Sequence, residues 1–152
     1  MKKGFTLVEI MIVVAIIALL AAIAIPNLLR ARLTANESAA QGTLQSLSAA
    51  AQSFRSANPN YPTALADLEN PAAGPAYISL GLDALSQKQG FTFAVVDTGD
   101  NNTFLSTAVP ANLNITGNRS FCVAEDGVIR EDPNGGGIAD RAGCVALNPV
   151  AQ

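Results

Sequence analysis

The sequence predicts an α+β fold, in which a long N-terminal helix packs through its second half on a small antiparallel sheet. Residues 5–56 contain one proline, Pro26, and are rich in residues that favour helices. From Ala57 onward, short apolar runs alternate with clusters of Gly, Asn, Asp and Pro, a pattern typical of strands joined by turns. We therefore expect a helix over about 5–56 followed by a sheet-containing head.

The first half of this helix is apolar on every side. The sixteen residues Ile10–Ile25 are all Ile, Met, Val, Ala or Leu, and no charge lies between Glu9 and Arg30. At about 1.5 Å per residue, a helix from Phe5 to Ile25 crosses the ~30 Å core of a bilayer. The lysines that precede it place the N-terminus in the cytoplasm. A helix apolar all round must be buried in a membrane or inside an assembly.

Glu9 lies at the edge of the apolar segment with no basic residue to match it. An acid in such a segment is costly and indicates a functional site with a partner. A secretory signal cut after Ala24 and an uncleaved anchor both leave Glu9 without a role. A leader that ends at Gly4 supplies the partner, because cleavage creates an α-amino group on Phe5, four residues from Glu9 on the same helix face. We expect this pair to form between staggered subunits and to set their axial register.

These residues form a recognisable motif: two lysines, then Gly4-Phe5, an acid at Glu9, an uncharged apolar stretch and Pro26. The motif resembles the N-terminus of type IV pilins, which the pseudopilins of type II secretion share. The resemblance implies that a membrane prepilin peptidase cuts between Gly4 and Phe5 and methylates the new amine of Phe5. It also implies that Glu9 contacts the amine of a neighbouring subunit.

Pro26 removes a backbone donor and disturbs the helix around it. We expect the helix to continue past Pro26, and the stretch near it to kink or to melt in a filament. The expected organisation is a cleaved leader (1–4), a transmembrane or filament-core helix (5–29), an amphipathic continuation (30–56) and a globular head (57–152).

The amphipathic continuation presents apolar residues at helical spacing, interrupted by Glu37. For Glu37, Arg30 and Arg32 two interpretations stay open. These side chains lie where the helix leaves the membrane or contact neighbouring subunits, or they form a solvated helix face. The residues at helical spacing are Leu33, Ala40, Leu44, Leu47, Ala51 and Phe54.

The head is expected to contain two short helices, four strands and a Gly-rich tail loop. Asp126-Gly127 lies between two apolar runs and predicts a hairpin. Thr63 is the expected N-cap of the first short helix. The expected helices are Thr63–Glu69 and Leu82–Gln89, and the expected strands are Phe91–Val96, Thr103–Val109, Ser120–Glu125 and Val128–Arg130.

Cys122 and Cys144 are the two cysteines of the chain, and no CxxC motif is present. Behind a membrane segment an even pair favours an exported disulfide, with two buried free thiols as the alternative. A bridge would close a loop of about 23 residues and stabilise the head by about 3 kcal/mol. In pilins a loop of this kind is exposed and takes part in subunit contacts or adhesion.

Composition argues against several functions. The chain has no His, no nucleophile–base pair and no cofactor motif, so we expect a protein that is not an enzyme and needs no cofactor. Loss of the two leader lysines leaves a net charge of −5, which argues against nucleic acid.

Asp132, Asn134 and Asp140 could offer oxygen ligands to Ca²⁺. They do not follow the EF-hand pattern, and a polar surface loop is the simpler interpretation.

We therefore expect a structural subunit of a type IV pilus, held in the bacterial inner membrane by a single pass with the N-terminus cytoplasmic. It would be processed by prepilin peptidase and assembled by pilus machinery into an extracellular filament of identical subunits, for adhesion, motility or DNA uptake. The alternatives are a major pseudopilin of a type II secretion system and, from another class, a secreted globular protein released after Ala24.

Overall fold

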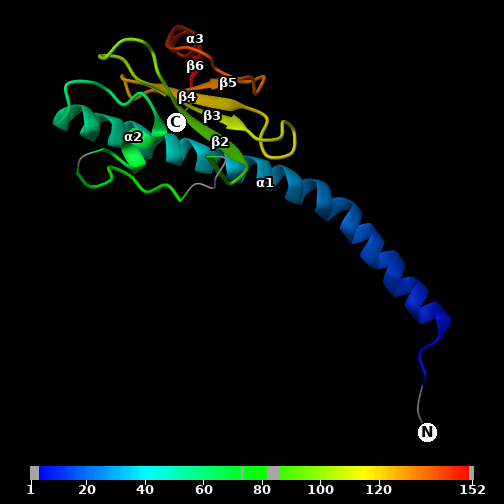
Figure 1. Cartoon of the computed structure of the whole chain (residues 1–152). Coiled ribbons are helices and arrows are strands. Elements are labelled where there is room, and N and C mark those ends of the chain that lie inside the picture. Colours follow the sequence, from blue (N-terminus) through cyan, green and yellow to red (C-terminus); the bar gives the residue numbers. More distant parts are fainter. Residues whose placement is uncertain (1–3, 73, 82–85, 151–152) are drawn as a thin grey trace. The chain divides into compact units, whose positions relative to one another are not determined.

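The computed structural model describes residues 4–72, 74–81 and 86–150, and its elements are labelled in Figure 1. The chain divides into a unit that ends at Arg32 and a unit that begins at Leu33.

Helix α1 spans Leu7–Ala57 and contains Pro26, which confirms that the helix continues past the proline. It begins two residues later and ends one residue later than expected. In the N-terminal unit its large apolar side chains are exposed, from Leu7 at 74 % to Leu29 at 56 %. By length and composition, α1 is long and apolar enough to cross a membrane.

The second unit contains a six-stranded sheet in which each strand pairs antiparallel with the next along the chain. The apolar runs of the head form its central strands, which are buried on both faces. The bounds of the expected strands shift by at most two residues. The strands are β1 (Gln87–Lys88), β2 (Phe91–Val96), β3 (Leu105–Pro110), β4 (Ser120–Ala124), β5 (Ile129–Asp132) and β6 (Asn148–Pro149).

The two faces of the sheet are buried by different elements, since successive side chains of a strand point to opposite faces. On one face, Phe121 and Val123 of β4 belong to a cluster with Leu44 and Leu47 of α1. On the other, Cys122 packs with Cys144 of the short helix α3 (Arg141–Ala146). Figure 1 shows the sheet with the C-terminal half of α1 on one side and α3 on the other. The α+β prediction is confirmed.

The hairpin at Asp126-Gly127 is also confirmed. It joins β4 to β5, and Gly127 has φ +72°, a backbone conformation that other residues rarely adopt. The N–H of Gly127 donates to the carbonyl of Ala124, which closes the turn.

Three expectations for the head are wrong. Helix α2 is Leu65–Glu69, so its N-cap is Ala64 and not Thr63. The Thr63 hydroxyl instead donates to the Asp67 carboxylate. The same carboxylate also accepts the N–H of Ala64. The second expected helix, Leu82–Gln89, is wrong at its C-terminal end, where Gln87 and Lys88 form strand β1. Residues 82–85 lie outside the described part of the chain.

The tail, expected as a plain loop, forms α3 and β6. Asp140 caps α3 by accepting the N–H of Gly143 at 2.6 Å, and the N–H of Val150 donates to the carbonyl of Ile129 beside β6. These contacts depend on β4 and β5, so the local sequence gives a weak signal for either element.

Candidate functional site

The N-terminal motif begins with exposed residues. Gly4 and Phe5 precede α1, and the Phe5 side chain is 86 % exposed. The peptide bond expected to be cut is therefore on the surface of the described chain.

Glu9 takes part in a helix cap. Its Oε2 accepts a hydrogen bond from the N–H of Thr6 (2.8 Å) and another from the Thr6 hydroxyl (2.7 Å). The N–H of Glu9 points back to the Thr6 hydroxyl at 3.3 Å. This reciprocal pattern is a capping box, in which two of the unpaired donors at a helix start are satisfied.

The capping box changes the interpretation of Glu9. We expected it to have no role without an amine partner, and the structure gives it one inside its own chain. The signal was present in the sequence, because Thr6-x-x-Glu9 before an apolar run is the pattern of a capping box. The pairing of Glu9 with the Phe5 amine of a neighbour stays a prediction.

Glu37 is buried in the head, which corrects both interpretations left open for it. It is 6 % exposed. Its Oε1 accepts the backbone N–H groups of Asn118 (2.9 Å) and Arg119 (3.3 Å). Its Oε2 accepts Nη2 (2.7 Å) and Nε (3.1 Å) of Arg119. These hydrogen bonds raise the pKa of the Arg119 guanidinium. Glu37 thus clamps the end of the β3–β4 loop to α1.

The clamp extends to a second carboxylate and to the loop itself. Arg119 Nη1 donates to Glu131 of β5, and the Nδ2 of Asn36 donates to the carbonyl of Thr116 at 3.0 Å. A buried charge is tolerated only when it is paired and hydrogen-bonded, and Glu37 meets this condition. Sequence reasoning missed the clamp because its partners lie about eighty residues away.

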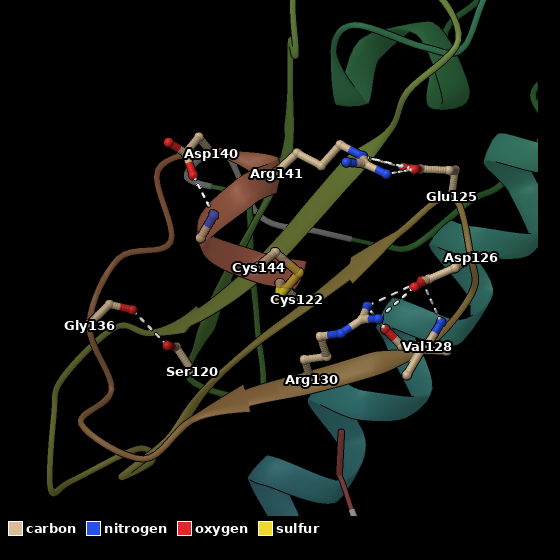
Figure 2. Close-up of a disulfide and its surroundings, with 11 residues drawn as sticks. Ser120, Cys122, Glu125, Asp126, Val128, Arg130, Gly136, Asp140, Arg141 and Cys144 are labelled. Atoms are coloured by element: carbon tan, nitrogen blue, oxygen red, sulfur yellow. Dashed lines mark hydrogen bonds and ion pairs between the residues drawn. A yellow bond between two sulfur atoms is a disulfide. The ribbon is translucent and has the colours of Figure 1, made fainter. Parts of the chain in front are cut away.

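The disulfide expected from the cysteine count is present (Figure 2). Cys122 of β4 and Cys144 of α3 are bonded, both are fully buried, and 22 positions separate them. In the same view the Ser120 hydroxyl donates to the carbonyl of Gly136 at 2.6 Å. The Gly-rich tail is thus tied to β4 by a covalent bond and a hydrogen bond.

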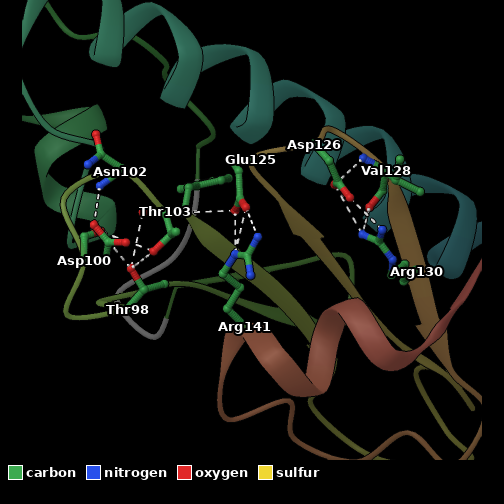
Figure 3. A network of polar contacts seen from close by, with 10 residues as sticks. Thr98, Asp100, Asn102, Thr103, Glu125, Asp126, Val128, Arg130 and Arg141 are labelled. Atoms are coloured by element: carbon green, nitrogen blue, oxygen red, sulfur yellow. Dashed lines mark hydrogen bonds and ion pairs between the residues drawn. The ribbon is translucent and has the colours of Figure 1, made fainter.

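Two ion pairs flank the β4–β5 turn (Figure 3). Arg141 of α3 donates to Glu125, and Arg130 of β5 donates to Asp126. The hydrogen bonds from Arg141 hold the pKa of Glu125 below its ordinary value, and those from Arg130 do the same for Asp126. The first pair adds a polar link between α3 and the end of β4.

The two carboxylates among the calcium candidates accept backbone N–H groups in the structure. Asp132 accepts the N–H of Asn134 at 2.9 Å, while Asp140 caps α3. Within residues 4–72, 74–81 and 86–150, His, Cys, Asp and Glu form no group of three that could hold a metal ion. The two carboxylates hold local turns.

Comparison with known proteins identifies the motif. Residues 1–25 match the family model "Prokaryotic N-terminal methylation motif". The chain is 40 % identical over 100 residues to the type IV wide pilus major component PilA4 of Thermus thermophilus, an alignment that covers 66 % of this chain and 68 % of PilA4. The chain belongs to the type IV pilin family.

Two further relatives match shorter parts of this pilin. It is 49 % identical over 60 residues to the type IV major pilin protein PilA of Myxococcus xanthus, which covers 40 % of this chain and 27 % of that protein. It is 33 % identical over 90 residues to the type II secretion system core protein G of Escherichia coli, covering 59 % of this chain and 61 % of that protein. No solved structure matches the chain significantly.

Proposed function

We propose that this pilin is a structural subunit of a type IV pilus and has no enzymatic activity. It is made as a precursor, held in the inner membrane by the apolar half of α1, and polymerised into an extracellular filament of identical subunits. The observation that carries the proposal is the methylation motif followed by a helix whose large apolar side chains are exposed. Such a surface has to be covered by lipid or by other helices.

We propose four functional parts: the leader 1–4, the membrane and filament-core helix 5–29, its amphipathic continuation 30–56 and the head 57–152. Prepilin peptidase cuts between Gly4 and Phe5 and methylates the Phe5 amine. In support, Phe5 is exposed and α1 begins only at Leu7, so the bond to be cut lies outside the helix.

Glu9 has two roles in this proposal. In one chain it caps α1 through Thr6. Between chains its charge pairs with the Phe5 amine, so that both charges are neutralised as the helices pack in lipid. The two roles differ in what they need: the cap needs a hydrogen-bond acceptor, whereas the pair needs a negative charge.

A pair of substitutions separates the two roles. Glu9→Gln keeps a capping side chain, because Gln also serves in capping boxes, but removes the charge. Glu9→Ala removes both. We expect both variants to be cleaved and membrane-bound, and both to give few filaments when sheared surface material is quantified. Normal filament yield from Glu9→Gln would show that the cap, and not the charge, is what matters.

A pseudopilin of a type II secretion system is the second candidate, favoured by the match to the Escherichia coli core protein G. The matches to two pilins at 40 % and 49 % identity favour the pilus. Presence of the subunit in filaments sheared from the cell surface distinguishes the two, since a pseudopilus stays in the periplasm.

A further inference from the structure

Exposed large apolar residues are few in the head. Among the described residues from Leu33 onward they are Leu113, Ile115, Val128 and Val145. Leu113 (47 %) and Ile115 (74 %) both lie in the β3–β4 loop, residues 111–119. Ile115 is the most exposed large apolar side chain among the described residues from Leu33 onward, so it stabilises its own head little and would gain free energy if a partner buried it.

The β3–β4 loop is preorganised. The N–H of Asn114 donates to the carbonyl of Gly117 at 2.9 Å, and the Thr116 hydroxyl donates to the carbonyl of Asn112 at 3.0 Å. Asn36 and Glu37 of α1 hold the C-terminal half of the loop. A loop fixed in this way loses little conformational entropy when it binds a partner.

Two glycines make room for the loop against the rest of the head. A Cβ on Gly135 would lie 2.3 Å from the Leu113 side chain, and one on Gly90 would lie 2.6 Å from the Cβ of Thr116. Both glycines have positive φ, 66° and 78°. The tail and the β1–β2 turn thus support the loop in a single position, with Ile115 outward.

The same unit carries a groove between α1 and the β5–β6 edge. It encloses about 390 Å³ and includes Val128, the third of the exposed apolar residues. The loop does not contribute to its lining. The groove is lined by Gln41, Gln45, Gly127, Val128, Ile129, Pro149 and Val150.

Charge indicates what fits this groove. From Leu33 to the C-terminus the chain has eleven acids and five basic residues, so two heads repel one another. Residues 111–118 carry no charge, and neither do the groove residues. Two copies can therefore approach through loop and groove without bringing like charges together or burying an unpaired one.

We propose that the β3–β4 loop of one subunit inserts Ile115 into the α1–β5–β6 groove of a second copy of this chain. The loop and the groove are different surfaces, so the contact is heterologous and repeats along an open polymer. This inference rests on the proposed function, because it names a contact between heads within the filament. Glu37 and Arg119 act as positioning residues, since they hold the loop and do not touch the second copy.

Cysteine cross-linking in the full-length pilin tests the contact. We would combine Ile115→Cys with Val128→Cys in one chain, assemble filaments in cells, and run sheared filaments on a non-reducing gel. The native cysteines do not interfere, because they are buried and bonded to each other. A heterologous contact places each loop against the next groove, so a ladder of multimers is expected.

The matched control combines Ile115→Cys with Val145→Cys, which lies on α3, is 41 % exposed and is outside the groove. It should give no ladder. A ladder of equal strength from the control, or no ladder from the first variant in filaments that form, would overturn the contact. Cross-linking that stops at dimers would also overturn it, since it indicates a symmetric contact. Absence of the chain from surface filaments would instead refute the proposed function and, with it, this inference.

A second variant keeps the test independent of cysteine chemistry. Ile115→Ser should lower filament yield by about tenfold or more, the factor expected from loss of one buried Ile side chain. The cleaved, membrane-bound pool should stay normal, because Ile115 is exposed in the free subunit. Val145→Ser is the control and should leave the yield unchanged. Equal yields from both variants would contradict the proposal.

Discussion

The clamp around Glu37 can be tested by substitution. Glu37→Ala removes an acceptor that receives four hydrogen bonds, two from backbone N–H groups and two from the Arg119 guanidinium. It leaves Arg119 next to a small cavity on the α1 side, still paired with Glu131.

The magnitude follows from burial. Breaking a fully buried ion pair costs about 3–5 kcal/mol. Arg119 keeps 36 % of its side chain exposed and Asn118 is at the surface, so both regain water when the carboxylate is lost. We therefore expect a loss of about 2–3 kcal/mol in the free energy of unfolding of the head, which lowers the midpoint of thermal unfolding by roughly 5–10 °C.

Near-UV circular dichroism of the full-length protein in detergent is the appropriate assay. Both tyrosines of the chain, Tyr61 and Tyr77, pack against the core of the head, so the tyrosine signal reports the head and not the apolar helix. Glu131→Gln is the control: it leaves all four hydrogen bonds of Glu37 in place, and Gln can still accept from Arg119, so it should cost less than Glu37→Ala. A Glu37→Ala midpoint equal to that of the wild type would refute the clamp.

Three further predictions concern the tail, the ion pairs and the helix. Reduction of the Cys122–Cys144 disulfide should lower the free energy of unfolding by about 3 kcal/mol, measured as a lower denaturant midpoint; an unchanged midpoint would refute its stabilising role. The pKa of Glu125 is lowered from 4.5 in the folded head, so stability should be lost as pH falls below that value, and Arg141→Gln should flatten this loss in thermal unfolding measured against pH. An equal loss in the variant would contradict this role for the ion pair. In the filament the helix should melt near Pro26, and electron microscopy that shows unbroken helical density through Leu19–Asn27 would contradict this.

Much of the fold could be predicted from local pattern. The 51 residues of α1 follow from an apolar run and good helix formers, and Pro26 does not end the helix. The β4–β5 hairpin follows from Asp126-Gly127, because the turn needs the positive φ that glycine supplies. In both cases the signal lies within a few residues of the element it predicts.

The missed features depend on contacts between distant residues. Helix α3 has six residues, one of them Gly143, and is held by the bond from Cys144 to β4 and by the pairing of Arg141 with Glu125. Strand β1 has two residues and exists only because β2 lies beside it. Glu37 interrupts an apolar pattern, and its burial becomes understandable only when Arg119 is seen beside it.

The candidate site divides in the same way. The residues for cleavage, methylation and register, Gly4, Phe5 and Glu9, could be named from the motif alone. The β3–β4 loop and the α1–β5–β6 groove could not, because they combine exposed side chains from segments that are far apart in the sequence. Leu113 and Ile115 each follow an asparagine, and nothing in that local sequence indicates that their side chains are exposed.

Mass spectrometry of the subunit N-terminus in filaments sheared from the cell surface tests whether this chain is processed and assembled as a pilin. We expect a mature subunit that begins with methylated Phe5. A mature chain that begins at Ile25, or filaments that lack this subunit, would contradict it.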